Sequence, residues 1–282
     1  NQGNLQFEEM AESYGVKNMG CGLASVFTDY DQDGDMDIMV ANDFGEWIEP
    51  DKLYRNEFPL PQFTDVSASS GFDSQIYGMG IGVGDYDQDG DLDYYKTNIG
   101  RNVLMHNRGD GTFSDTTADA GIEDEYIFDQ GPYLSIGWGA GFIDFDLDTY
   151  VDLVVSNGRI GSSVFFPSRD SMPDKVYHNN GDGTFTDQAL SLGVVNYGLS
   201  RGLACGDVDN DGDPDILFTT IPHFYLGLPG EPILYRNNQT TDRAWLKVQL
   251  VGTTSNRDAI GARMDIYAGN QHWVHEVNSG GQ

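Results

Sequence analysis

The sequence has few basic residues and no long apolar run, and each shortage excludes a class of protein. Only 15 lysine and arginine residues accompany 45 aspartate and glutamate residues, which gives a formal net charge of −30. This balance argues against nucleic-acid binding, because phosphates require a basic surface. A membrane-spanning helix needs about twenty consecutive apolar residues. No such run is present, so we expect no transmembrane segment, and residues 1–20 do not resemble a signal peptide.

Cysteines and catalytic motifs are equally scarce. Cys21 and Cys205 lie at non-equivalent places in the repeat described below, so we expect buried free thiols. A disulfide between them would require the first and last repeats to meet. The sequence also contains no nucleophile elbow, phosphate-binding loop, zinc motif or Cys/His constellation. Motif analysis therefore gives no support for a common enzyme class.

What the sequence does contain is an acidic nonapeptide, Asp-x-Asp-x-Asp-Gly-x-x-Asp, in four copies. Carboxylates at positions 1, 3, 5 and 9, with a backbone carbonyl at position 7, form the all-oxygen ligand set that Ca²⁺ prefers. We expect about four Ca²⁺ ions per chain. The predicted ligands are Asp29, Asp31, Asp33, Asp35 and Asp37; Asp85, Asp87, Asp89, Asp91 and Asp93; Asp144, Asp146, Asp148, Tyr150 and Asp152; and Asp207, Asp209, Asp211, Asp213 and Asp215.

The third copy departs from the pattern. Thr149 occupies the position where the sharp turn favours glycine, and Tyr150 replaces an aspartate, so we expect this site to be the weakest. The four loops hold five, five, four and five aspartates, which is 19 of the 45 acidic residues. Without a cation these carboxylates repel one another, so calcium binding should be coupled to folding.

The residues around each loop indicate strands rather than the helices of an EF-hand. Position 12, where an EF-hand needs a glutamate, holds Val40, Lys96, Val155 and Phe218 in turn. The copies begin 56, 59 and 63 residues apart, which is the length of a propeller blade. After each loop come a Leu-Tyr-Arg-Asn-like strand and then, most clearly in the second and third repeats, a Gly-Asp-Gly-Thr-Phe turn into a fourth strand.

The fold class is therefore predicted as all-β, a β-propeller of four-stranded blades followed by a small β module. We expect about four blades within residues 1–240. The predicted repeats span residues around 20–70, 76–122, 135–195 and 198–238, preceded by an N-terminal strand that belongs to an adjoining blade.

These blocks resemble the FG-GAP/VCBS repeats, relatives of the integrin α-subunit head. The closing segments, Trp245 to Val248 and Ser255 to Arg263, resemble the ASPIC/UnbV module found in the cartilage acidic protein family. The resemblance implies that residues 241–282 are part of this module. It also implies that the chain is a C-terminal fragment of a longer polypeptide, with its blades forming part of a seven-bladed ring. Two alternatives stay open: Leu5 to Met10 could supply the outer strand of the fourth blade and close a four-bladed ring, or open blade edges could pair between chains in a polymer.

Ligand recognition is expected on the face opposite the calcium loops, where the longer and more varied connections lie. Their aromatic side chains suit a protein or glycan ligand, and the candidates are Trp47, Tyr126, Tyr133, Phe165, Phe166, Phe224 and Tyr225. The asparagines that recur at the ends of the second and third strands are expected to make structural hydrogen bonds. His106 and His178, in the third strand, are expected on the blade surface rather than as metal ligands.

The function that these features favour is a calcium-binding extracellular or cell-surface propeller for adhesion or recognition, with structural calcium and no catalytic residues. The alternatives are a calcium-dependent polysaccharide lyase or hydrolase, or a subunit of an extracellular polymer. A hydrolase would need two carboxylates that face each other across a cleft. Asp43, Glu46, Glu125 and Asp129 lie on the predicted ligand face but resemble ordinary solvated loop acids.

Overall fold

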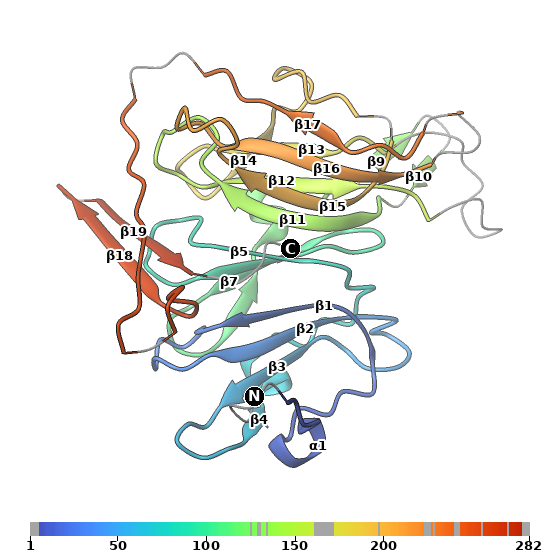
Figure 1. Ribbon diagram of the computed structural model, residues 1–282. Coiled ribbons are helices and arrows are strands. Elements are labelled where there is room, and N and C mark those ends of the chain that lie inside the picture. The colour runs from blue at the N-terminus through green and yellow to red at the C-terminus, as the bar shows by residue number, and fades with distance from the viewer. Residues whose placement is uncertain are drawn as a thin grey trace.

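The computed structural model is nearly all β, with four antiparallel sheets arranged as the blades of a β-propeller (Figure 1). The expected fold class is confirmed. The structure describes residues 6–124, 126–128, 131–133, 135–160, 172–196, 198–222, 227, 229–239, 243–254, 256–269 and 271–277.

In each blade the strands follow one another in chain order from the inner to the outer edge. Blade 1 contains β1 (Cys21–Thr28), β2 (Asp37–Asp43), β3 (Lys52–Asn56) and β4 (Phe63–Asp65). Blade 2 contains β5 (Ile81–Gly84), β6 (Asp93–Lys96), β7 (Val103–Asn107) and β8 (Phe113–Asp115). Blade 3 contains β11 (Gly137–Ile143), β12 (Asp152–Asn157), β13 (Lys175–Asn179) and β14 (Phe185–Asp187). Among the described residues, blade 4 contains three strands, β15 (Leu199–Gly206), β16 (Asp215–Ile221) and β17 (Ile233–Tyr235).

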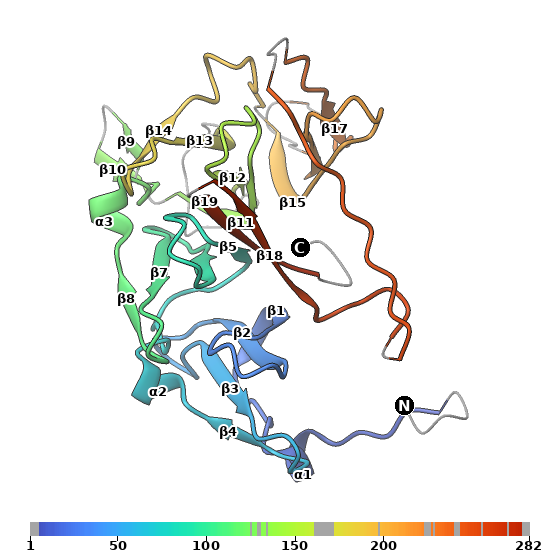
Figure 2. The ribbon, with the colours of Figure 1, turned by 90° about the vertical axis from the view of Figure 1, so that its left-hand side faces the viewer.

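Short elements connect the blades. The single-turn helices α1 (Ala11–Tyr14), α2 (Ser67–Ser70) and α3 (Thr117–Ala120) lie before blades 1, 2 and 3, and each ends at a glycine in the left-handed conformation. A two-stranded hairpin of β9 (Tyr126–Phe128) and β10 (Gly131–Tyr133) follows α3. Near the C-terminus, β18 (Arg263–Ala268) and β19 (Gln271–Glu276) form a further hairpin beside the blades (Figure 2).

The hydrophobic core is divided among the interfaces between blades. Between blades 1 and 2, Tyr30, Phe72, Tyr94 and Phe113 pack with ring centroids 5.6 to 6.4 Å apart. Two further clusters fill the interfaces between blades 2 and 3 and between blades 3 and 4. Each blade thus buries its apolar faces against its neighbours, as expected for an array of repeats.

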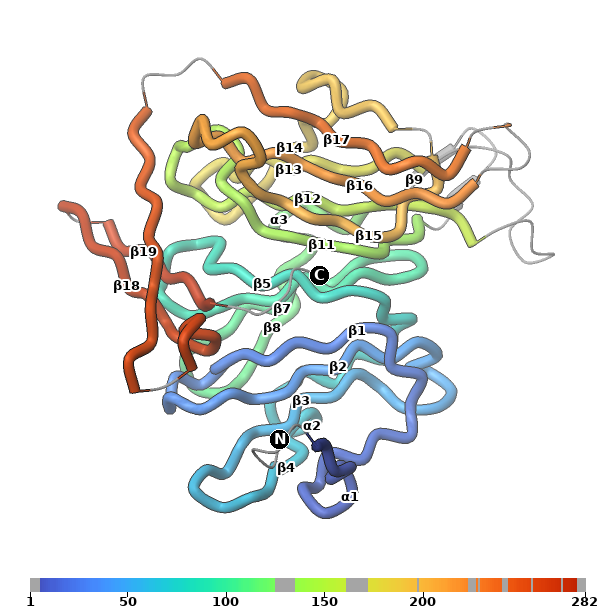
Figure 3. The backbone as a smooth tube through the Cα atoms, in the orientation of Figure 1, coloured from blue at the N-terminus to red at the C-terminus, as the bar shows by residue number. Residues whose placement is uncertain are grey.

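The four blades form an open arc rather than a closed ring. Strand β5 lies between β1 and β11, and β11 lies between β5 and β15, so β1 and β15 are at opposite ends of the arc (Figure 3). Residues 6–10 lie in no strand, and β17 has no outer neighbour among the described residues. The ring closure by residues 5–10 that we kept open is therefore not the arrangement of this chain.

The position of blade 1 at the end of the arc also corrects the expectation for one cysteine. Both cysteines are free, but Cys21 is exposed rather than buried, because β1 has an inner-strand neighbour on one side only. Cys205 is partly buried against the cluster between blades 3 and 4. Within the described residues, no helix is long and apolar enough to cross a membrane.

A fully buried ion pair joins blades 1 and 2. Lys96 Nζ lies 3.0 Å from Asp51 Oδ2, and both side chains are completely shielded from solvent. The ammonium also donates to Phe72 O (2.9 Å) and Ser74 Oγ (2.6 Å). Asp51 in turn accepts the backbone N–H of Asn42 through Oδ1 (2.9 Å), so these contacts link four segments of the chain.

Replacing the buried lysine should destabilise the protein strongly. In Lys96→Met, Asp51 stays buried without its cation, and we expect the free energy of unfolding to fall by about 3–5 kcal/mol. Chemical denaturation monitored by tryptophan fluorescence would measure the change. Lys17→Met is the matched control, because Lys17 forms an exposed pair with Glu12, and its effect should be within about 0.5 kcal/mol. Equal effects of the two substitutions would contradict the structural role of the buried pair.

Candidate functional site

The aspartate at the ninth position of each acidic loop ties the loop to its blade. In the second loop, Asp93 Oδ2 accepts the N–H of Tyr86 (3.3 Å) and Oδ1 accepts the N–H of Asn107 (2.8 Å). The corresponding aspartates of the other loops, Asp37, Asp152 and Asp215, accept the same two backbone N–H groups at 2.7 to 3.3 Å. Each one therefore connects the start of the loop to the end of the third strand.

The backbone of all four loops follows one conformation. The fourth residue lies in the left-handed region at φ 57 to 62°, and the sixth does so at φ 87 to 99°. In the first two loops, Gly34 and Gly90 each donate the N–H of position 6 to an oxygen of the first aspartate at 3.1 Å. Thr149 makes the same bond to Asp144 at 2.9 Å, so the third loop keeps the turn despite its threonine.

The aspartates at positions 1, 3 and 5 of the first three loops converge. In each of these loops one oxygen from each of the three carboxylates lies within 4.8 Å of the others. Asp29 Oδ1, Asp31 Oδ1 and Asp85 Oδ1 are buried and accept no hydrogen bond. A buried carboxylate oxygen without a partner is costly, and a hard cation with oxygen ligands would satisfy it. The unpaired carboxylate oxygens of the first two loops therefore fit a bound Ca²⁺ ion.

Burial disfavours ionisation of carboxyl groups at the first and ninth positions of the loops when no cation is bound. Desolvation raises the pKa of Asp37 and Asp152 to about 8, and that of Asp85 and Asp93 to about 7. A pKa that is higher in the folded state than in the unfolded state means that stability is lost as pH rises through the folded value. The metal-free fold is therefore weakened between about pH 4 and pH 8, the range where Ca²⁺ would supply compensating charge.

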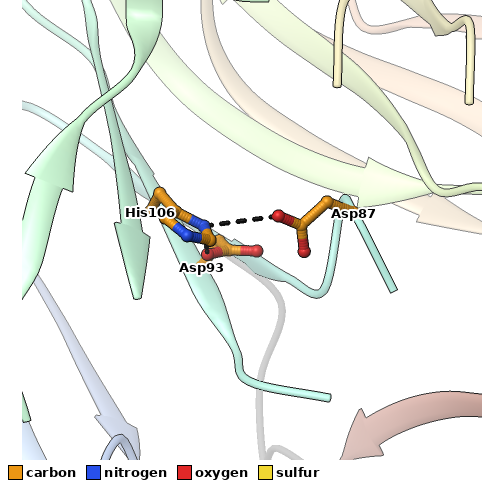
Figure 4. A group of neighbouring side chains, drawn as sticks. All are labelled: Asp87, Asp93 and His106. Carbon is orange, nitrogen blue, oxygen red and sulfur yellow. Dashed lines mark ion pairs between the residues drawn. The ribbon is translucent and has the colours of Figure 1, made fainter. Parts of the chain in front are cut away.

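Two histidines that the sequence placed on the blade surface face the loops instead. His106 Nδ1 lies 3.4 Å from Asp87 Oδ2 and 3.3 Å from Asp93 Oδ1, as Figure 4 shows. His178 repeats the arrangement beside Asp146 and Asp152. The nearby carboxylate of Asp93 raises the pKa of His106. The sequence contained one indication of this placement, because His106 and His178 occupy the third-strand position that holds the cations Arg55 and Arg236 in blades 1 and 4.

The carbonyl of the sixth loop residue links adjacent loops to the C-terminal hairpin. Gly90 O accepts from Gln32 Nε2 of the preceding loop (3.2 Å) and from Arg263 Nη2 of β18 (2.7 Å). Thr149 O accepts from Gln88 Nε2 of its preceding loop (2.7 Å) and from Trp273 Nε1 of β19 (3.0 Å). The hairpin therefore covers the face of the arc that carries the acidic loops.

The recurring asparagines make structural hydrogen bonds, in agreement with the prediction. At the end of the third strand, Asn107 Nδ2 donates to Tyr30 O in the loop of the preceding blade at 2.9 Å. Asn179 and Asn237 donate to the preceding blade in the same way, at 2.8 and 2.7 Å. At the end of the second strand, Asn42 and Asn98 donate to carbonyls just before the third strand.

The expected ligand-face residues are described unevenly. Trp47 lies in the connection between β2 and β3 and is 74 % exposed, with Ile48 exposed beside it. Tyr126 and Tyr133 pair through their backbones in the β9–β10 hairpin. Phe165, Phe166, Phe224 and Tyr225, together with Glu125 and Asp129, lie outside the described residues.

The threonine of the third loop should store backbone strain. Thr149 is β-branched and lies at φ 87°, where such residues pay roughly 1–2 kcal/mol. Thr149→Gly should therefore raise the free energy of unfolding by about 1 kcal/mol, minus the small loss of an exposed bond from Gln271. Gly34→Thr is the matched reverse substitution, because a Cβ at Gly34 would meet nothing within 4 Å. Urea titrations of both variants would test this, and unchanged midpoints would disprove the strain.

Comparison with known proteins identifies the repeat. The family described as FG-GAP-like repeat matches residues 29–96, 85–155 and 144–218. Among curated proteins, cartilage acidic protein 1 of Homo sapiens is 27% identical over 227 residues, which cover 77% of this chain and 31% of that protein. Cartilage acidic protein 1 of Xenopus tropicalis is 28% identical over 228 residues, 78% of this chain and 32% of that protein. The chain thus spans about a third of the length of these relatives.

Solved structures show weaker similarity. An Agrocybe aegerita lectin that recognises non-reducing terminal N-acetylglucosamine is 17% identical, with a TM-score of 0.29, over 77% of this chain and 67% of that chain. The exotype rhamnogalacturonan lyase YesX is 12% identical, with a TM-score of 0.36, over 78% of this chain and 46% of that chain. These TM-scores are too low to carry an argument about function. The matches to residues 29–218, on blades with four equivalent acidic loops, show that the chain belongs to the FG-GAP-like repeat family.

Proposed function

We propose that the protein is a calcium-stabilised propeller segment that recognises a protein or glycan ligand outside the cell. The observation that carries the proposal is the convergence of buried, unpaired carboxylate oxygens in the acidic loops, above all those of Asp29, Asp31 and Asp85. The proposed ligand sets are the twenty loop residues predicted from the sequence, with about four Ca²⁺ ions and the third site weakest. Similarity to cartilage acidic proteins and the FG-GAP-like repeats supports an extracellular location.

The calcium would be structural rather than catalytic. Each loop connects the first and second strands of a blade, and its ninth residue also holds the third strand, as for Asp93 and Asn107. A cation bound among the carboxylates would remove their mutual repulsion and hold these three strands together. Calcium would thereby keep the loop face rigid enough to seat the C-terminal hairpin through Arg263 and Trp273.

Recognition is assigned to the connections on the opposite face. Trp47 presents an exposed indole, and Phe44 packs edge-on against Tyr77 with ring centroids 5.8 Å apart. Exposed aromatic rings held by a rigid sheet suit the apolar faces of sugars and the side chains of proteins. We propose a non-catalytic role, because recognition does not require the opposed pair of carboxylates that a glycoside hydrolase needs. A calcium-dependent polysaccharide lyase or hydrolase is the alternative.

We further propose the domain division suggested by the sequence, with propeller blades in residues 1–240 and part of an ASPIC/UnbV module in residues 241–282. The β18–β19 hairpin lies in the second region and makes its contacts on the loop face. This arrangement gives the two regions different tasks, with the blades carrying the ligand surface and the module covering the calcium loops.

Calcium should control the stability of the whole chain. At pH 9, above the pKa values of about 7 to 8 of the buried carboxyl groups, we expect chelation to lower the melting temperature by more than about 10 °C and excess calcium to restore it. Metal analysis of the dialysed protein should give about four Ca²⁺ per chain. Asp87→Ala should lose about one ion, because Asp87 supplies position 3 of the second loop.

The control for that variant is Asp119→Ala, which removes an exposed carboxylate of α3 and should leave the calcium content unchanged. A protein that retains no calcium and melts at the same temperature with and without chelator would refute the structural role of the loops. In that case the acidic loops would need another explanation, and the enzyme alternative would have to be tested first.

Ligand binding should depend on the exposed indole. In a glycan array and a panel of extracellular matrix proteins probed with calcium, Trp47→Ala should weaken binding at least about tenfold, because an aromatic anchor dominates such contacts. Phe58→Ala is the control, since Phe58 is equally exposed but lies in the turn between β3 and β4. Turnover of a bound polysaccharide, measured as new reducing or unsaturated ends, would favour the enzyme alternative over recognition.

A further inference from the structure

One position of the repeat varies where its neighbours do not. The residues six positions before the four acidic loops are, in chain order, Leu23, Met79, Trp138 and Arg201. On both sides of this position every blade has a small residue, which is glycine, alanine or serine. Aliphatic, aromatic and cationic side chains thus alternate within a constant frame, as expected where a repeat carries a binding surface.

The small neighbours are required for packing between blades. A Cβ added at Gly80 would collide with the carbonyl oxygen of Trp138, and one added at Gly139 would lie 3.0 Å from the Cβ of Leu203. These glycines let the inner strands β5, β11 and β15 approach one another closely, as they do in Figure 3. The frame around the variable position is therefore fixed by the contacts between inner strands.

The backbone is irregular at the variable position. In blades 1, 3 and 4 the pairing of the first two strands shifts register there, between Gly22 and Ala24, between Gly137 and Ala140, and between Ser200 and Leu203. A bulge in a strand redirects a side chain out of the regular alternation of the sheet, and bulges are frequent beside functional sites. Leu23, Trp138 and Arg201 each lie within one of these shifts.

The four variable residues line one cavity. Its volume is about 330 Å³, and the small residues that follow the variable ones in sequence complete its lining. This volume is near the lower end of the range for small-ligand sites, about 300–1,000 Å³. The cavity lies where the inner strands begin, on the face opposite the acidic loops. A propeller keeps its inner strands around a central channel, so further blades in a longer ring would extend the circle beside this cavity without filling it.

Arg201 brings to the cavity a charge that no carboxylate among the described residues neutralises. Its Nη1 donates to Gly158 O (3.2 Å) and Ser200 O (2.7 Å), and its Nη2 donates to Arg159 O (2.8 Å). The guanidinium carbon lies 4.0 Å from the ring centroid of Trp138. Desolvation lowers the pKa of Arg201 to about 10, so the side chain is still protonated at neutral pH.

This lack of a carboxylate partner is notable in a chain with a formal net charge of −30. Ion pairs to carboxylates are made by Arg55, Arg101, Arg236, Arg243 and Arg263. A guanidinium has donors on three nitrogens, and the described residues accept only from Nη1 and Nη2 of Arg201, which leaves Nε–H for a ligand. A carboxylate is the planar acceptor that matches this group.

We propose that this cavity binds a terminal sugar unit that carries a carboxylate, with Arg201 binding the anionic group. The inference rests on the proposed recognition function and gives it a second contact site, apart from Trp47 on the same face. Leu23 and Met79 supply apolar contact for the C–H groups of a sugar ring, and Trp138 holds the guanidinium by stacking. A terminal unit fits better than the interior of an acidic polymer, because the cavity is small and the net charge would repel a long polyanion.

Matched glycans test the ligand class. The probes are oligosaccharides that end in a uronic acid or a sialic acid, each beside a neutral counterpart in which the carboxyl is reduced to an alcohol. Calorimetry in excess calcium should show at least about tenfold tighter binding of one or more acidic forms than of their neutral counterparts, because reduction removes the charge-assisted hydrogen bond. Equal affinities for every pair would overturn the proposal, as would a preference for sulfated sugars or acidic peptides.

Two variants test the residues. Arg201→Gln should weaken binding of the acidic glycan about tenfold or more and leave binding of the neutral form unchanged, whereas a purely structural arginine would affect both. Arg108→Gln is the matched control, because Arg108 is exposed in the turn between β7 and β8. Leu23→Glu keeps the bonds of Arg201 to the backbone but adds a competing carboxylate to the cavity, so it should weaken binding similarly. Its control is Leu60→Glu, at an exposed position outside the cavity.

The outcomes separate this site from the proposed function. Glycan binding that depends on Trp47 but is unchanged in Arg201→Gln and Leu23→Glu would overturn this site and leave the recognition function intact. No binding of any glycan or matrix protein would overturn both. Equal calcium content and melting temperature of the variants and the wild type would show that lost affinity is not lost folding.

Discussion

The blades depend on the two hydrogen bonds that the buried aspartate at the ninth position of each loop accepts from the backbone. One carboxylate holds two backbone N–H groups, from the loop and from the third strand, in a place without solvent, as Asp93 does with Tyr86 and Asn107. The same burial raises the pKa of that carboxyl to about 7. Burial therefore disfavours the ionised form of Asp93, and nearby positive charge would stabilise it. His106 lies 3.3 Å from this carboxylate, and the acidic loop beside it has the geometry to hold a cation.

The loops also connect neighbouring blades to one another. Asparagines at the end of the third strand reach across to the loop of the preceding blade, and glutamines at the fourth loop position reach forward to the next loop, as Asn107 and Gln32 do. The second and third acidic loops receive both kinds of contact and are therefore held from both sides. The contacts depend on the loop backbone rather than on its variable side chains, so the third loop can accommodate Thr149 and still receive Gln88.

Most of the blade architecture could be predicted from the sequence because its signals are local and repeated. The acidic nonapeptides, the Leu-Tyr-Arg-Asn strands and the turns each occur several times, so one strong copy helps to place a weak one. The position of the C-terminal hairpin against the loops could not be predicted. Arg263 and Trp273 each donate to one carbonyl far away in sequence, and these contacts produce no repeated sequence motif. Cys21 is exposed because β1 lies at the end of the arc, and the sequence of a single repeat does not show which blade lies there.

The same limit applied to the candidate site. The carboxylates were evident from composition and spacing, whereas the histidines facing them required knowing which side of the third strand meets the loop. His106 and Arg55 share a position in the repeat, but only the packing of β7 against the second loop brings the imidazole beside Asp87 and Asp93.

The contact between β19 and the first acidic loop has a consequence for the order of folding. Glu276, near the last described residue, accepts hydrogen bonds from Thr28 Oγ1 (2.8 Å) and from the backbone N–H of Asp29 (3.3 Å), across nearly the whole sequence. The blades are built from hairpins whose partners are close in sequence, so they can form while the chain is being synthesised. The first acidic loop would then stay open to solvent until β19 leaves the ribosome and covers it.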